Sequence, residues 1–132
     1  MKKRMKKETR PLTNYDHNVL LPILIKGLEM KKGKMNAVTN RQIVHKLRSH
    51  GLKVSHRDVS TLINHIRTND LVVGLVASSM GYYTTDSERE FMDYAQSLLG
   101  REKEIRKVRK SIERQRRMLF APRQRQLFET KL

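Results

Sequence analysis

The stretch that decides the fold is VSHRDVSTLINHIRTNDLVVGLVASSMGYYTT, residues 54–85. Near its start, Ser55 and Asp58 have the spacing of a capping box, in which each side chain accepts a hydrogen bond from the other residue's amide. Apolar residues then recur at the spacing of a single helix face: Val59, Leu62, Ile63 and Ile66. The stretch therefore begins with an amphipathic helix, which we expect to end near residues 68–70.

After this helix the pattern changes to that of β-structure. Residues 71–76 are rich in Leu and Val, and residues 82–85 hold two tyrosines and two threonines. Residues 78–81, Ser-Ser-Met-Gly, have the composition of a turn. We therefore predict a hairpin, and we expect at least one of Tyr82 and Tyr83 to face the core. Residues 36–38 are a candidate for a short third strand.

A second capped helix lies just upstream. Thr39 and Gln42 form a capping box, and the helix ends at His50-Gly51, with Ile43, Val44 and Leu47 as its apolar face. Two capped helices joined by a short turn are typical of a helix-turn-helix, and a hairpin that follows the second helix is typical of a wing. Residues 15–32 predict the first helix of the domain, which can hold Pro22 only in its first turn. Its apolar side would consist of Val19, Leu20, Ile23, Leu24 and Leu28.

Residues 87–120 predict one long charged helix, opened by a capping pattern of Ser87 and Glu90 and followed by Pro122. Five apolar residues recur along it at a seven-residue interval: Phe91, Leu98, Ile105, Ile112 and Leu119. The companion heptad position is interrupted by Arg101 and Gln115, so this is a partial coiled-coil seam. We expect the seam to form a homodimer; the first helix of the same chain is the alternative partner.

The predicted fold class is therefore helix-rich α+β, a winged helix-turn-helix with a long C-terminal helix. The chain divides into a basic flexible arm (1–13), the winged-helix domain (14–86), the long charged helix with its dimerisation seam (87–120) and a flexible tail (121–132).

The charge of the chain indicates a polyanionic partner. In 132 residues the formal net charge is +16, and such an imbalance opposes compaction unless an anion neutralises it. Nucleic acid is the first choice and an anionic membrane surface the second. The apolar stretch 19–28 is too short to span a bilayer. Because no apolar segment follows the basic N-terminus, we predict no signal peptide and expect a cytoplasmic protein.

The helix over residues 55–69 is the candidate reader of DNA. Arginine can bridge two acceptors of guanine, asparagine can pair with adenine, and threonine can contact the thymine methyl group. The base-contacting candidates lie opposite the apolar stripe: Arg57, Ser60, Thr61, Asn64 and Thr68. The phosphate-contacting candidates are Lys2, Lys3, Arg4, Lys6, Lys7, Arg41, His56, Arg67, Ser78 and Ser79. The alternative is an ordinary solvated helix face.

The sequence offers no catalytic constellation, and we predict a protein that is not an enzyme. It has no phosphate-binding glycine loop, no nucleophile elbow and no HExxH motif. It has no cysteine, and its five histidines lack the spacing of metal ligands, so we expect neither a metal nor another cofactor.

Residues 54–119 resemble winged-helix DNA-binding proteins of bacteriophages and mobile elements. The resemblance rests on the capped helix, on the wing turn from Ser78 to Tyr83 and on a charged helix containing Leu98-Leu99-Gly100-Arg101. It implies duplex DNA binding in transcription regulation or DNA replication, near the nucleoid of a bacterial host. A weaker tail resemblance, to the peptide that docks on the bacterial sliding clamp, rests on Gln124, Leu127 and Phe128. The alternatives are a protein-interaction adaptor, for example a replisome, polymerase or host-defence binder, and an RNA-binding protein.

Overall fold

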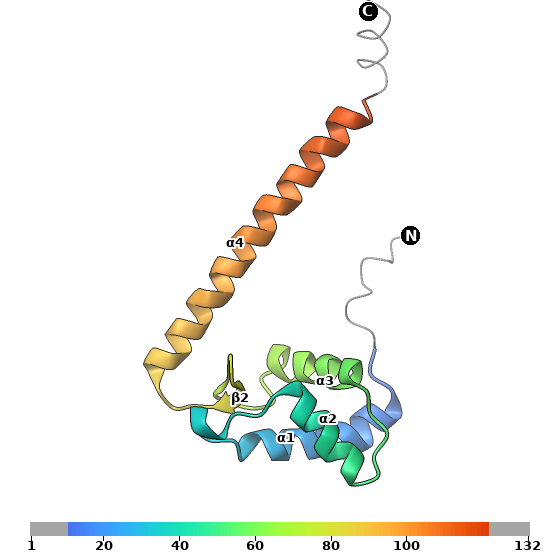
Figure 1. Cartoon of the computed structure of the whole chain (residues 1–132), viewed down its shortest axis with the longest axis vertical. Helices are drawn as coiled ribbons and strands as arrows, with labels where there is room; N and C mark the ends of the chain where they lie inside the picture. The colour runs from blue at the N-terminus through green and yellow to red at the C-terminus, as the bar shows by residue number, and fades with distance from the viewer. Residues whose placement is uncertain (1–10, 122–132) are drawn as a thin grey trace, which may run out of the picture. The chain divides into compact units, whose positions relative to one another are not determined.

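The computed structural model describes residues 11–121, which form a helix-rich α+β structure (Figure 1). The elements in chain order are a π-helical segment (Asp16–Leu20), α1 (Leu21–Glu29), a 3-10 turn (Lys34–Asn36), α2 (Asn40–Ser49), α3 (His56–Thr68), β1 (Leu75–Ser78), β2 (Gly81–Thr84) and α4 (Glu88–Leu119). The chain separates into two compact units, the first ending at Tyr94 and the second beginning at Ala95.

The N-terminal helical run, in which the π-helical segment leads directly into α1, ends at Glu29, before the predicted limit at residue 32. Pro22 lies in the first turn of α1, as expected, because proline lacks the amide that a later helical position must donate. The preceding segment is held by a reciprocal cap that the sequence analysis missed. The Asp16 amide donates to Thr13 Oγ1 over 3.0 Å, and the Thr13 amide donates to Asp16 Oδ2 over 3.1 Å. The prediction that Ile23 belongs to the core is wrong, since its side chain is 42% exposed.

The predicted capping boxes of α2 and α3 are confirmed. At the start of α2, Thr39 Oγ1 accepts from the Gln42 amide and the Thr39 amide donates to the Gln42 side chain. At the start of α3, Ser55 and Asp58 make the same exchange over 3.0 and 2.9 Å. These caps fix where α2 and α3 begin, because they satisfy amides that the first helical turn leaves without partners.

The hairpin is antiparallel, with Leu75 opposite Thr84 and Ser78 opposite Gly81. Its first strand begins later than predicted, because Asp70 and Gly74 have φ angles of 56° and 88° that interrupt extended backbone. The predicted third strand is a single bridge, in which Val38 pairs with Tyr82. Residues 34–36 cannot extend it, because they form the 3-10 turn.

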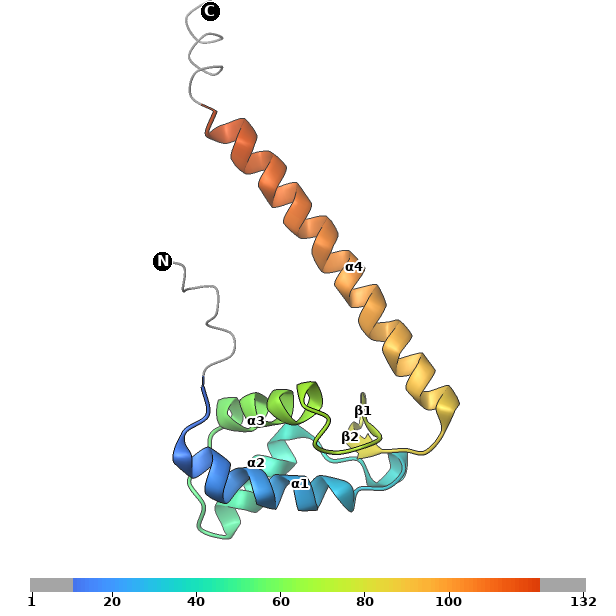
Figure 2. The ribbon, with the colours of Figure 1, turned by 180° about the vertical axis from the view of Figure 1, so that it is seen from behind.

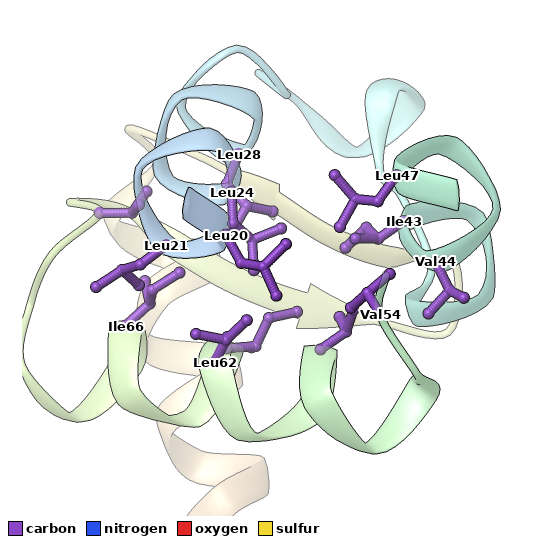
Figure 3. Close-up of a cluster of buried hydrophobic side chains, with 13 residues drawn as sticks. Leu20, Leu21, Leu24, Leu28, Ile43, Val44, Leu47, Val54, Leu62 and Ile66 are labelled. Carbon is purple, nitrogen blue, oxygen red and sulfur yellow. The ribbon is translucent and has the colours of Figure 1, made fainter. Parts of the chain in front are cut away.

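The core lies among α1, α2, α3 and the hairpin (Figure 3). Leu62 and Ile66 point into it from α3, facing Leu20 and Leu21 from the N-terminal helix. Tyr83 is buried while Tyr82 is half-buried, which confirms that at least one of the two faces inward. Figures 1 and 2 show α1 and α3 on opposite sides of the first unit, with the hairpin near the ends of both helices.

The long helix is confirmed as α4, and none of its residues is buried. Ion pairs along it join Arg106 to Glu102 and Arg109 to Glu113. Its start differs from the predicted capping box. Ser87 Oγ accepts from the Glu90 amide, but the Glu90 carboxylate accepts from the Tyr83 hydroxyl over 3.0 Å instead of from the Ser87 amide.

Candidate nucleic-acid interface

The candidate interface is the side of α3 that faces away from the core. The opposite side buries Val59, Leu62, Ile63 and Ile66 almost completely, each at most 1% exposed. The outer side carries Arg57, Ser60, Thr61, Asn64 and Thr68, of which all but the half-buried Thr61 are exposed. The five predicted base-contacting residues therefore lie on one helix, around a face that the core leaves uncovered.

Positive charge exceeds negative charge on this helix. Asp58 is the single acidic residue of α3, and its carboxylate accepts a hydrogen bond from the Ser55 amide at the helix start. Arg57 and Arg67 supply positive charge, and His56 lies exposed in the first turn. A polar helix face on which two arginines outnumber a single carboxylate engaged in the helix cap suits an anionic ligand.

The five candidates divide by what their side chains already contact. The Thr68 hydroxyl donates to the Asn64 carbonyl oxygen over 2.9 Å, so it is engaged with the backbone in the last turn of α3. Ser60 Oγ accepts from Asn40 Nδ2 over 2.9 Å, which ties α3 to the start of α2. Within residues 11–121, the side chains of Arg57, Thr61 and Asn64 make no hydrogen bond or ion pair. These three are the ones left available to a ligand.

Asn40 is a polar residue of this region that the sequence analysis missed. It is half-buried at the start of α2, and its Oδ1 atom is buried without a hydrogen-bond partner in the described part of the chain. Its position directly after the predicted cap Thr39 was visible in the sequence. Its contact with Ser60 was not, because 20 residues separate the two.

The predicted phosphate contacts within the described residues do not form one cluster of free groups. Arg41 is exposed in the first turn of α2, next to Asn40. Arg67 is engaged, because its guanidinium donates to the Tyr94 hydroxyl over 2.6 Å and lies 5.8 Å from the centre of the Tyr94 ring. Ser78 Oγ accepts from the Met80 amide inside the hairpin turn, and Ser79 is exposed beside it.

Two groups of predicted residues lie outside residues 11–121. They are the arm residues Lys2, Lys3, Arg4, Lys6 and Lys7, and the docking residues Gln124, Leu127 and Phe128.

Metal and membrane sites were sought in the same part of the chain. Across residues 11–121, no group of three His, Asp or Glu side chains converges in a way that could hold a metal ion. None of the helices described there combines the length and the apolarity needed to cross a bilayer.

Comparison of the chain with protein-family models, with curated proteins and with solved structures finds no match. The arguments about function therefore rest on the residues and their geometry.

Proposed function

We propose that this chain is a winged-helix protein that binds duplex DNA and acts by occupying it, as a transcription regulator or a replication accessory factor of a phage or mobile element. In this proposal α2, the turn at Gly51 and α3 form the helix-turn-helix, and the β1–β2 hairpin forms the wing. The protein is not an enzyme, and it works in the cytoplasm of a bacterial host.

The observation that carries the proposal is the exposed face of α3. Arg57, Thr61 and Asn64 have donors, acceptors and a methyl group suited to base edges in the major groove, and they have no competing partner among residues 11–121. The net charge of +16 supports a polyanionic ligand. An exposed polar helix face alone would not favour DNA; the combination with this charge does.

The seam of α4 supports self-association as part of the proposal. Ile105 and Ile112 are 68% and 58% exposed, and they lie one heptad apart on a helix that buries none of its residues. A second copy of α4 can cover these side chains, as the helices of a coiled coil do. A dimer would present two copies of α3 to two half-sites of a palindrome.

Selection of random duplexes on the purified protein tests the proposal, because it asks whether any sequence is preferred. With the selected duplex, Arg57→Ala should weaken binding by about 1–3 kcal/mol, or roughly fivefold to 150-fold. Arg57→Lys is the matched control for charge, since lysine keeps the cation but cannot make the two parallel hydrogen bonds of arginine. Arg89→Ala, on α4, removes the same charge elsewhere.

Three results would contradict the proposal. The first is a selection that enriches no sequence. The second is a loss with Arg57→Ala no larger than the loss with Arg89→Ala. The third is tighter binding to an RNA duplex than to the matching DNA duplex at equal salt, which would favour the RNA-binding alternative.

A further inference from the structure

An apolar groove with a volume of about 750 Å³ runs between α1 and α2. Leu24 and Leu28 line it from α1, and Ile43 and Leu47 line it from α2. Figure 3 shows these four side chains reaching toward one another from the two helices. Although all four are buried, Ile23 and Met30 extend the apolar lining into solvent, at 42% and 76% exposed. The groove therefore joins the core to an uncovered apolar surface.

Gly27 keeps the groove open. It lies inside α1, lines the groove, and has no positive φ angle that would require glycine. A Cβ atom added to it would meet no heavy atom within 4 Å. Glycine is a poor helix former, so neither the backbone nor the packing of α1 explains its presence. Because Gly27 lines the groove, a longer side chain at this position would take up space in it.

The charges on the groove indicate what kind of ligand fits. Lys31, Lys46 and His50 line it, and no Asp or Glu is among its lining residues, which all lie between positions 23 and 52. The chain's own tail is disfavoured as an occupant, since residues 121–132 hold three cations and one acidic residue, Glu129. A carboxylate-bearing ligand gains attraction from the rim while its apolar groups enter the groove.

We propose that this groove binds an acidic amphipathic helix of another protein. Such a helix would present apolar side chains at the i, i+4 and i+7 positions to the groove and carboxylates to Lys31 and Lys46. None of the groove residues belongs to α3, and Figure 3 shows α3 along the other side of the core from α1 and α2. The inference thus goes beyond DNA binding, and the two interactions do not compete for the same side chains.

The test uses the full chain and three labelled peptides of about 16 residues, long enough to form a helix on binding. One has Leu at i, i+4 and i+7 with Glu on its flanks, the second has Lys in place of every Glu, and the third has the composition of the first in scrambled order. Fluorescence anisotropy should give an affinity for the acidic peptide at least about tenfold higher than for the other two. Amide resonances of Gly27 and Leu47 should shift.

Two variants locate the binding. Gly27→Leu should weaken binding of the acidic peptide about tenfold or more, because its side chain fills the groove. Gly100→Leu is the matched control, a helical glycine on α4 with equally open surroundings, and should leave the affinity within about twofold. DNA binding should be unchanged in Gly27→Leu, so failure here leaves the proposed function intact.

Equal affinity for the three peptides, or equal effects of the two leucine substitutions, would overturn the proposal. So would a dimer in light scattering that Gly27→Leu dissociates and Gly100→Leu does not, because the occupant would then be a second copy of this chain.

Discussion

Replacing Gly81 by alanine should disrupt the pairing of the hairpin with Val38 and destabilise the domain. Gly81 has a φ angle of 120°, which L-residues rarely adopt, and a Cβ atom there would clash with the backbone carbonyl of Val38. The backbone strain costs roughly 1–3 kcal/mol. Relieving the clash separates Val38 from Tyr82 and breaks two hydrogen bonds, of 2.9 and 2.8 Å. Each is worth about 0.5–1.5 kcal/mol.

The total expected for Gly81→Ala is therefore about 2–6 kcal/mol of unfolding free energy. Gly51→Ala is the matched control, because Gly51 has a φ angle of 80° but open space around its Cβ position. It should cost only about 1–2 kcal/mol, from the backbone alone.

Urea unfolding followed by tyrosine fluorescence measures this difference. The chain has no tryptophan and four tyrosines, all within the unit that ends at Tyr94. For a domain of this size, Gly81→Ala should also lower the Tm by roughly 10 °C or more. Equal losses of unfolding free energy in Gly81→Ala and Gly51→Ala would refute the argument, because they would mean that the contact with Val38 contributes nothing to stability.

Two further predictions concern α4 and its contacts. The pKa of Tyr83 is raised above the usual value of 10.0, mainly because the side chain is buried. The hydrogen bond to Glu90 and the negative charge of Glu90 raise this pKa further. The unfolded chain therefore loses this proton first as pH rises past 10, so stability should fall there. At neutral pH, Tyr83→Phe should lower the free energy of unfolding by about 1 kcal/mol, because the hydrogen bond to Glu90 is lost. Above pH 10, urea unfolding should show that this free energy falls less steeply with pH than in the wild type. An equally steep fall would mean that other groups cause the loss of stability at high pH. On the seam, Ile105→Asp should shift a dimer to monomer in light scattering, while Lys103→Asp, a charge change off the seam, should not.

Local features of this fold were predictable and long-range ones were not. The capping boxes at Thr39 and Ser55 were read correctly, because a cap depends on residues three positions apart. The start of β1 was missed, since residues 71–73 have the composition of a strand but the positive φ angles at Asp70 and Gly74 interrupt it. The angle at Asp70 belongs to the end of α3, where the Leu71 amide donates to the Ile66 carbonyl, whereas Gly74 takes part in a longer-range hydrogen bond, from the Thr85 amide to its carbonyl.

In the candidate site, too, local features were predictable from the sequence and long-range contacts were not. Periodicity placed Arg57 and Asn64 opposite the buried stripe of α3, and the structure has them exposed there. Periodicity could not reveal that Arg67 contacts Tyr94, 27 residues away, or that Ser60 is engaged by Asn40. The exposure of Ile23 was also missed, because it depends on how far α2 lies from α1 across the groove.

If this chain binds DNA, the distribution of charge indicates that different segments provide affinity and sequence preference. The segment from Arg101 to Arg117 holds nine of the 29 Lys and Arg residues and three of the 13 acidic ones, whereas α3 holds two Arg. Affinity that depends on phosphate neutralisation should therefore come mainly from residues 101–117 and the N-terminal arm. Arg57 and Asn64 would then govern which sequence is chosen more than how tightly DNA is held. If the groove between α1 and α2 binds an acidic helix, its apolar contacts should persist at high salt, whereas the attraction of Lys31 and Lys46 for carboxylates should weaken. The preference for the acidic peptide over its lysine counterpart should therefore shrink as the salt concentration rises.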